Sequence, residues 1–275
     1  MGSTTSPNHI ALGLNIDHIA TLRQARQIHY PDPLEAIFIA KNCQVSQITL
    51  HLREDRRHIH ENDVKRIIES SPLPINVECA CDISKGGVVD ILCKLKPFKV
   101  TLVPEKRQEI TTEGGLDMRT KNLDSVIARF QDNGILVATF IDPTLESIMR
   151  SKELGVNGVE LHTGTYANLY EMLYSCLPYS HNTPKTLQIS RSALRQNLAN
   201  ALCALTLASE QAHSLDLEVY AGHGLNYENI TAIAQIPFVR ELNIGHSIIS
   251  RAVIVGLERA IKDIKECIWH AIVRK

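Results

Sequence analysis

Eight short runs of apolar, often β-branched residues recur along the 275-residue chain, and each is followed by a longer segment of helical period. The runs span residues 11–17, 47–52, 74–79, 98–103, 135–141, 156–162, 215–221 and 239–244. Parallel strands need long crossover connections, usually helices, and eight such units close into a barrel. The alternation therefore predicts an α/β fold, a (β/α)8 TIM barrel with additional helices.

An open doubly wound sheet is the alternative architecture for this alternation. That fold usually carries a G-x-G-x-x-G turn after its first strand, and none follows residues 11–17. No low-complexity tract or Pro/Gly-rich linker divides the chain. We therefore expect a single domain over residues 1–275, with a disordered tail at 1–10 and an irregular insertion at 170–190.

Composition excludes several classes of protein. The formal net charge is −1, and non-specific nucleic-acid binding needs a basic excess. The seven cysteines form no C-x-x-C pair, which is typical of a reduced, intracellular compartment. No apolar run reaches the length of a membrane span, and the first residues show no signal-peptide pattern. We expect a cytoplasmic protein that binds neither nucleic acid nor membrane.

Polar side chains gather where the predicted strands end. In a barrel of parallel strands, the carboxyl ends and the loops after them build the active site. In chain order these ends carry Asn15, Asp17 and His18, then His51 and Arg53, Glu78, Glu160 and His162, His223, and finally Gly245 and His246. The stretch HLREDRRH at 51–58 then forms one part of a ring of polar groups. A solvated helix start is its alternative interpretation.

Two Gly–His turns follow the last two predicted strands, in AGHGLN (221–226) and NIGHSI (243–248). At Gly224 and Gly245 the missing Cβ lets backbone N–H groups approach an anion, and a following helix N-terminus favours negative charge. These two loops commonly form the phosphate site of such barrels. Arg26 and Arg53 are suited to bidentate phosphate contacts. We therefore predict phosphate binding, although glycines that only serve tight turns are the alternative.

Proton transfer has four candidate residues: His18, His51, His223 and Glu78. Histidine titrates near neutrality, so its ring can accept or donate a proton at working pH. Glu78 ends an apolar strand, where desolvation can raise its pKa. A hydrogen-bonded structural role is the alternative for each histidine and stays open at this point.

Metal and Schiff-base chemistry are both disfavoured. The H-x-H of residues 58–60 lies beyond its strand, and later strands lack a convincing supporting ligand pattern. Lys99 lies early on its strand, and Lys106 lies in a long polar loop, so neither is well placed as a Schiff-base lysine. We expect no required metal and no other cofactor.

Seven segments closely resemble the pyridoxine 5′-phosphate synthase family. They are NIDHIATLRQAR (15–26), YPDP (30–33), HLREDRRHI (51–59), VPEKRQEITTEGGLD (103–117), ELHTGTYA (160–167), AGHGLNY (221–227) and ELNIGHSII (241–249). The resemblance runs from about residue 12 to the C-terminus. It implies condensation of 1-deoxy-D-xylulose 5-phosphate with 3-amino-2-oxopropyl phosphate. The products are pyridoxine 5′-phosphate, phosphate and water, and the reaction needs no metal or redox cofactor. It also implies assembly as a homo-octamer.

The resemblance implies a role for each matching residue. His51 and Glu78 are expected to act as bases, His223 as an acid, and Glu160 as a stabiliser of transition-state charge. The residues expected to contact the deoxyxylulose phosphate are Asp17, His18, Arg53, His58 and Thr111. Those expected to contact the amino-ketone phosphate are Asn15, Arg26, Gly224, Gly245 and His246. The loop at 104–117 is expected to close over the substrates. Residues 170–190 are longer and more irregular than the family pattern.

Two other functions remain as alternatives. A sugar-phosphate epimerase or aldolase on the same barrel would need only one phosphate pocket. An RNA-binding protein would use HLREDRRH and EKRQE as a contact surface, but the chain lacks the basic excess and the stacking aromatics.

Overall fold

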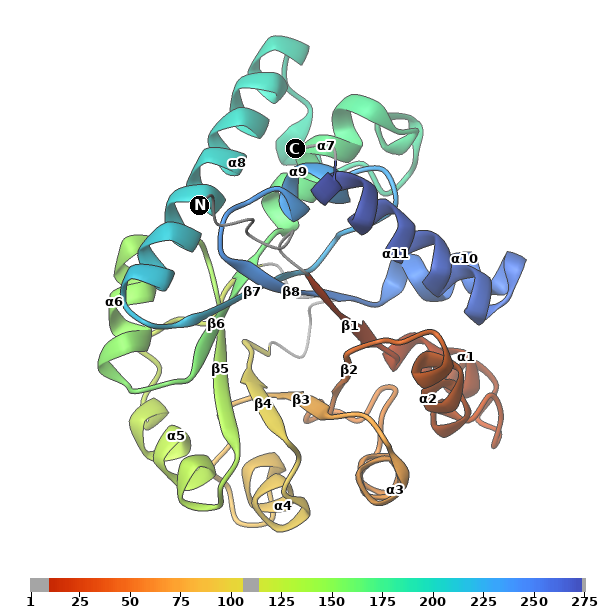
Figure 1. Ribbon diagram of the computed structural model, residues 1–275, viewed down its shortest axis with the longest axis vertical. Coiled ribbons are helices and arrows are strands. Elements are labelled where there is room, and N and C mark those ends of the chain that lie inside the picture. Colours follow the sequence, from red (N-terminus) through yellow and green to blue (C-terminus); the bar gives the residue numbers. More distant parts are fainter. Residues whose placement is uncertain (1–9, 106–113, 274–275) are drawn as a thin grey trace, which may run out of the picture.

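The computed structural model describes residues 10–105 and 114–273. Eight parallel strands close into a barrel in the order β1 to β8, and helices surround the ring (Figure 1). This confirms the predicted (β/α)8 TIM barrel. The strands are β1 Ala11–Asn15, β2 Gln47–His51, β3 Ile75–Cys79, β4 Lys99–Leu102, β5 Leu136–Ile141, β6 Gly158–His162, β7 Glu218–Gly222 and β8 Val239–Ile244. Each lies within or next to its predicted run.

The helices follow the strands in sequence. They are α1 Asp17–Arg26, α2 Pro33–Asn42, α3 Glu61–Ser70, α4 Val88–Leu95, α5 Leu123–Asp132, α6 Leu145–Glu153, α7 Gly164–Tyr174, α8 Arg191–Ser214, α9 Ile230–Ala234, α10 His246–Val255 and α11 Leu257–Val273. Local sequence sets several of their starts. At α2, for example, the Asp32 carboxylate accepts the backbone N–H of Leu34 at 3.0 Å and Pro33 is the first helical residue. No helix of the described residues is long and apolar enough to cross a membrane.

The hydrophobic core lies between the strands and the surrounding helices. Strand residues such as Leu14, Leu50 and Val77 are fully buried there. They alternate with residues that point into the barrel, because successive strand side chains face opposite sides. The core therefore surrounds the barrel and leaves its interior to a different set of side chains.

The barrel interior is polar. Lys99 on β4 and Gln47 on β2 both donate to Glu241 Oε1 on β8, at 3.0 and 3.1 Å. None of these strands pairs with another, so these contacts cross the inside of the ring. Branched apolar residues usually fill such interiors. These three polar groups are stable here because they are hydrogen-bonded to one another.

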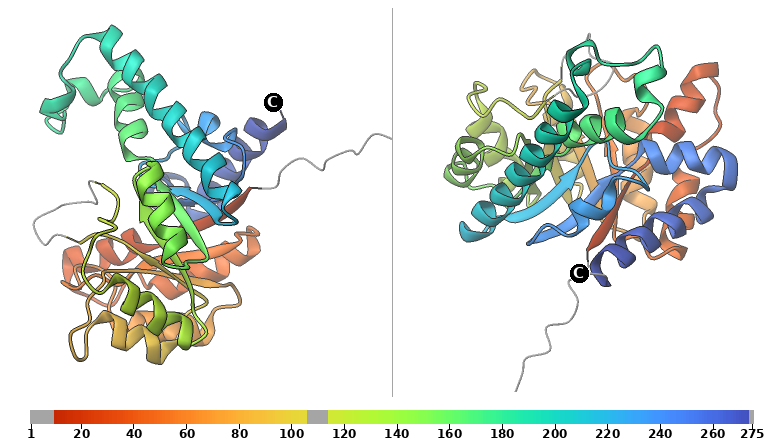
Figure 2. Two further views of the ribbon diagram at one scale, coloured as in Figure 1. Left: turned by 90° about the vertical axis from the view of Figure 1, so that its left-hand side faces the viewer. Right: turned by 90° about the horizontal axis from the view of Figure 1, so that it is seen from above.

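Between β6 and β7 the chain leaves the barrel. Two short 3₁₀ helices, η1 Leu177–Tyr179 and η2 Lys185–Leu187, connect α7 to the 24-residue α8. A separate apolar cluster holds α7 against α8, with Leu173 and Leu194 among its members. Figure 2 shows this green-to-teal part of the chain extending beyond the ring of strands. The irregular segment that the sequence predicts at 170–190 thus contains the end of α7 and both 3₁₀ turns.

Candidate active site

Asp17 links the carboxyl ends of β1 and β2. As the first residue of α1, it is buried, and its carboxylate accepts the backbone N–H of His51 at 2.8 Å. Its second oxygen accepts the side-chain amide of Asn15 at 3.0 Å, while Asn15 Oδ1 accepts the backbone N–H of Asp17 at 2.9 Å. Both carboxylate oxygens have partners, so the side chain is fixed at the rim.

His51 lies between two carboxylates. Its Nε2 is 2.8 Å from Glu105 Oε1, and its Nδ1 is 3.7 Å from Glu78 Oε2. The His51 side chain is only 7% exposed. The two ring nitrogens therefore face acids from two different strand ends, β3 and β4, and the sequence predicted the first of these acids.

Two glutamates, the half-buried Glu78 and the buried Glu160, hold their protons more tightly than usual. Burial raises the pKa of Glu78 well above its ordinary value, and the charges of Glu160 and Asp17 raise it further. Burial also raises the pKa of Glu160, to about 7, against the opposing effect of Lys99. Glutamates with raised pKa values can take up and release protons near neutral pH.

Space for the Glu160 side chain comes from a glycine. A Cβ at Gly222 would lie 2.3 Å from Glu160 Oε1, so a larger residue there would displace the carboxylate. Asn243 holds the other oxygen, since its Nδ2 donates to Glu160 Oε2 at 2.8 Å. Thr49 completes the chain by donating to Asn243 Oδ1 at 3.1 Å. Glu160 is thus fixed from β8 and, through Asn243, from β2.

His223 follows β7 in a left-handed backbone conformation. Its φ is 79°, and that of Gly224 is 80°. Such a conformation in a non-glycine residue costs energy and is often found at functional sites. Thr163 Oγ1 donates to the His223 carbonyl at 2.6 Å and stabilises the turn. Burial lowers the pKa of His223 to about 4, with a contribution from His162.

His162 and Asp142 form a second histidine–carboxylate pair beside His223. His162 Nδ1 lies 3.1 Å from Asp142 Oδ1, and the rings of His162 and His223 are 5.2 Å apart. Asp142 also accepts the backbone N–H of Gly115 at 3.0 Å. The other ring nitrogen of His162 is buried with no hydrogen-bond partner among the described residues. This pair links the rim to the end of the loop after β4.

The two Gly–His turns lead into different structures. After β8, α10 begins at His246 as predicted, directly after Gly245. After β7, the next helix begins only at Ile230, so the prediction that this turn enters a helix directly was wrong. A Cβ at Gly224 would instead lie 3.8 Å from the Cα of Gly164, the first residue of α7. The helix N-terminus next to the Gly224 turn is therefore that of α7, which follows β6.

Three further predicted residues lie near this rim. His18 is close to His246, with ring centroids 4.8 Å apart, and burial together with the charge of His246 lowers the pKa of His18. His58 is buried 6.1 Å from the His51 ring, and burial lowers its pKa too. Arg53 is also buried and directs Nε toward Asp55, 3.4 Å away.

One predicted residue of the described part of the chain stands apart from this group. Arg26 is exposed at the last turn of α1, roughly 14 Å along the helix from Asp17 at 1.5 Å per residue. Thr111 lies outside the described residues, as does Lys106. Lys99 lies inside the barrel in its ion pair with Glu241 and not at the rim, in agreement with the sequence.

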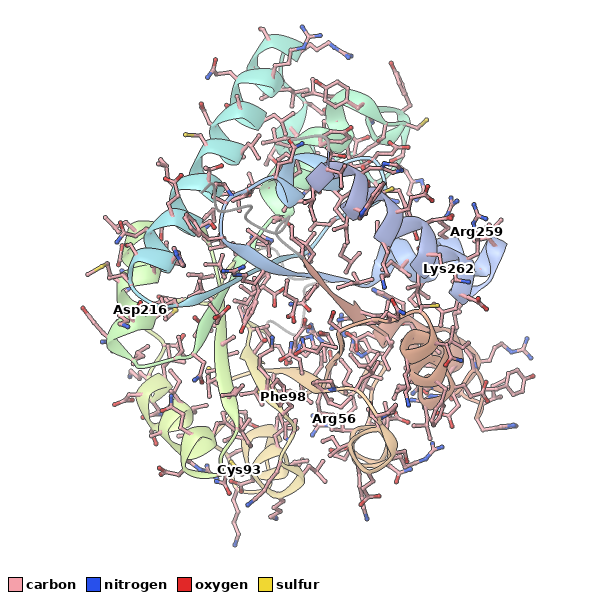
Figure 3. The ribbon with its side chains drawn as sticks, in the orientation of Figure 1. Arg56, Cys93, Phe98, Asp216, Arg259 and Lys262 are labelled. Atoms are coloured by element: carbon pink, nitrogen blue, oxygen red, sulfur yellow. The ribbon has the colours of Figure 1, made fainter. Side chains whose placement is uncertain are left out.

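The arginine-rich stretch at 51–58 divides into two parts. Arg56 and Arg57 form local ion pairs with Glu61 and Asp55, at 2.7 and 2.6 Å. Figure 3 labels Arg56 and shows side-chain nitrogen and oxygen atoms gathered inside the ring of strands. The first residues of the stretch, including His51, belong to the rim, whereas its later arginines stabilise the loop before α3.

Sequence reasoning assigned no role to Glu105, Asp142, His162 and Asn243. A signal existed for two of them, since His162 lies two residues after Glu160 and Asn243 two residues before Gly245, on the same strand faces. Glu105 and Asp142 lie in loops, where no period indicates which way a side chain points.

Asp17, His51 and Glu78 also have the geometry of a possible cation site. One ligand atom of each lies within 4.8 Å of the others. Both oxygens of Asp17 already accept hydrogen bonds, whereas the His51 nitrogen that faces Glu78 is Nδ1, since Nε2 contacts Glu105. The expectation that no metal is required stays a prediction.

A closed barrel with buried acids and histidines at the carboxyl ends of its strands defines an α/β-barrel enzyme of the acid–base type. The comparisons with known proteins make this specific. Residues 12–270 match the family model described as "Pyridoxal phosphate biosynthesis protein PdxJ". The chain belongs to this family and is an enzyme of vitamin B6 biosynthesis.

Curated relatives agree with the family match over nearly their whole length. The pyridoxine 5′-phosphate synthase of Helicobacter hepaticus is 56% identical, covering 94% of this chain and 97% of that protein. The enzyme of the same name from Wolinella succinogenes is 54% identical, covering 93% and 97%. A solved structure of the tryptophan synthase A-subunit from Pyrococcus furiosus matches with a TM-score of 0.59 at 12% identity, covering 94% of this chain and 98% of that one. This last likeness concerns the fold alone.

Proposed function

We propose that this chain condenses 1-deoxy-D-xylulose 5-phosphate with 3-amino-2-oxopropyl phosphate to give pyridoxine 5′-phosphate, phosphate and water. The observation that carries the proposal is the grouping of Asp17, His51 and Glu78 within 4.8 Å, at the rim that also bears the two Gly–His turns. Joining an amine to a ketone and forming an aromatic ring requires repeated proton transfers in a site protected from water. Several buried acids and bases at one rim suit that requirement.

The proton-transfer roles in this proposal are those that the family resemblance implies, and the positions of these residues support them. Glu78, whose pKa is raised by burial, removes carbon-bound protons, and His51 acts as the second base beside it. His223 remains neutral at pH 7, because burial lowers its pKa to about 4, and its ring N–H acts on the substrate by donating a hydrogen bond to an oxygen where negative charge develops. Glu160 stabilises charge that develops in the transition state.

Two substrates with one phosphate each need two anion sites. Asp17, His18, Arg53, His58 and Thr111 contact the deoxyxylulose phosphate in this proposal. The resemblance assigns Asn15, Arg26, Gly224, Gly245 and His246 to the amino-ketone phosphate, and of these Arg26 lies apart from the rim, on the exposed last turn of α1. The N-terminus of the ten-residue α10, directly after Gly245, supports the second set, since helix N-termini bind phosphate through free N–H groups.

The proposal extends to assembly. We expect a homo-octamer, as the family resemblance implies, and a cytoplasmic location, as the cysteine usage indicates. Exposed apolar side chains on α10 and α11, such as Ile254 (82% exposed) and Trp269 (58%), suit contacts between subunits. Light scattering coupled to size-exclusion chromatography measures the mass directly, and a monomer at micromolar concentration would contradict this part.

The decisive test is to mix the purified protein with both substrates. We expect the fluorescence of the pyridoxine ring and stoichiometric release of phosphate. Omitting either substrate should abolish both signals, which excludes an epimerase or aldolase that acts on deoxyxylulose phosphate alone. A protein that releases no phosphate in the presence of both substrates would refute the proposal.

A further inference from the structure

The Glu105 carboxylate contacts one specific ring nitrogen of His51, Nε2. Its Oε1 lies 2.8 Å from His51 Nε2, and its Oε2 accepts the backbone N–H of Glu54 at 3.0 Å. The Glu105 side chain is 5% exposed. Both of its oxygens therefore have donors, and the carboxylate is held in a single orientation next to the ring.

This arrangement decides where neutral His51 carries its proton. A carboxylate only accepts hydrogen bonds, so the nitrogen that faces it must be the protonated one. Burial alone would raise the pKa of Glu105, but the hydrogen bonds from His51 and from the Glu54 N–H oppose that effect, and the pKa lies below its ordinary value. Glu105 is thus an anion, and the lone pair of His51 lies on Nδ1.

That lone pair lies where the proposed reaction needs a base. His51 Nδ1 is 3.7 Å from Glu78 Oε2, whereas Nε2 is taken up by Glu105. With the opposite tautomer, the lone pair would face the Glu105 carboxylate and Nδ1 could accept no proton from a substrate. The same carboxylate also stabilises the imidazolium that forms once Nδ1 has taken up a proton.

We propose that Glu105 is a positioning residue for the synthase reaction, which fixes the Nε2–H tautomer of His51 so that Nδ1 acts as the base beside Glu78. This inference rests on the function proposed above. In the step itself, a proton moves from the substrate to Nδ1, and the electron pair of the broken bond stays on the substrate. Glu105 touches no reacting atom.

The first experiment reads the tautomer without any substrate. ¹⁵N-histidine NMR distinguishes Nε2–H from Nδ1–H, and His51→Gln assigns the signal. We expect Nε2–H in the wild-type protein. In Glu105→Gln the amide cannot accept from both His51 and Glu54, so the Nδ1–H form should appear. Glu266→Gln is the matched control, since Glu266 pairs with His270 at 3.5 Å on the exposed face of α11.

The second experiment separates positioning from folding. In Glu105→Gln we expect kcat to fall about 10–100-fold, with KM for either substrate changed less than about threefold. Glu266→Gln should leave both unchanged. An Nδ1–H tautomer in the wild type, or an unchanged tautomer or kcat in Glu105→Gln, overturns the inference, and a lower melting temperature alone does not rescue it. A wild-type protein without synthase activity would refute the proposed function instead, while the NMR result would still stand.

Discussion

Arg23→Met removes a buried guanidinium that links α1 to α3. Arg23 Nη1 and Nη2 donate to the two oxygens of Asp63 at 2.8 and 2.7 Å, and Nη2 also donates to the carbonyl of His58 at 3.0 Å. Arg23 is 8% exposed and Asp63 5%. The variant therefore leaves a buried carboxylate without its cation, and it releases the loop that carries His58.

The expected loss is large for a single substitution. Removing one partner of a buried ion pair costs about 3–5 kcal/mol. An unfolding entropy of about 2.1 cal/mol/K per residue gives about 0.6 kcal/mol/K for 275 residues, so the melting temperature should fall by about 5–9 °C. Differential scanning calorimetry at pH 7 measures this. The Asp63 pKa is held below its ordinary value: burial raises it, but the hydrogen bond and charge of Arg23 outweigh that effect. The deficit should therefore shrink as the pH falls below about 4.

Two further variants check the reasoning. Arg150→Met breaks an exposed pair with Glu153 (3.0 Å, side chains 46% and 58% exposed) and should cost about 0–1 kcal/mol. Arg23→Met/Asp63→Leu leaves no unpaired buried charge and should recover most of the loss. About 1 kcal/mol stays lost, since Asp63 also accepts the backbone N–H of His60 at the start of α3. If Arg23→Met melts within about 1 °C of the wild type, the pair is not a buried link between the two helices.

Four other changes test the site. Glu78→Gln should lower kcat by about 100-fold or more with little effect on substrate binding, which steady-state kinetics and calorimetric titration would show; near-normal turnover would remove Glu78 from the mechanism. Treatment with EDTA should leave turnover unchanged, because both oxygens of Asp17 already accept hydrogen bonds; a loss restored by a divalent cation would contradict this. The fold raises the Glu160 pKa to about 7, so the wild type loses stability as the pH rises from 5 to 8. Glu160→Gln lacks this loss, and its melting temperature should therefore rise relative to that of the wild type over the same interval. Melting temperatures that depend on pH equally in the two proteins would count against this. Gly222→Ala should destabilise the protein by about 1–3 kcal/mol and lower kcat, because its Cβ would lie 2.3 Å from Glu160 Oε1; a wild-type melting curve would show that the carboxylate has room to move.

The fold could be predicted from the sequence because each strand and each helix leaves its own pattern in a short stretch of residues. A run such as residues 47–52 has the length and β-branched content of a buried strand, and the structure places β2 at Gln47–His51. The convergence of Asp17, His51 and Glu78 followed from the same information, since parallel strands in a closed barrel bring their carboxyl ends to one rim.

Contacts that depend on loops and helix packing could not be predicted in this way. Nothing in the local sequence distinguishes Glu105, which contacts His51, from the other charged residues of its loop. Likewise, Arg23 and Arg26 lie on the same helix, yet Arg23 is buried against Asp63 and Arg26 is exposed. The position of α3 decides between them, and that position is a property of the whole fold.

The polar interior of the barrel explains how the rim acids can be both buried and chemically active. A carboxylate such as Glu160 would be costly in an apolar barrel, because no group there could donate a hydrogen bond to it or balance its charge. Here Asn243 donates to it at 2.8 Å, and the charge of Lys99 lowers its pKa while burial raises it. Lys99 in turn is held by Glu241 at 3.0 Å, one layer deeper. The deeper Lys99–Glu241 pair therefore moderates the acidity of Glu160, so a substitution of either residue should alter the charge of Glu160, and with it the stabilisation of the transition state, without touching a substrate.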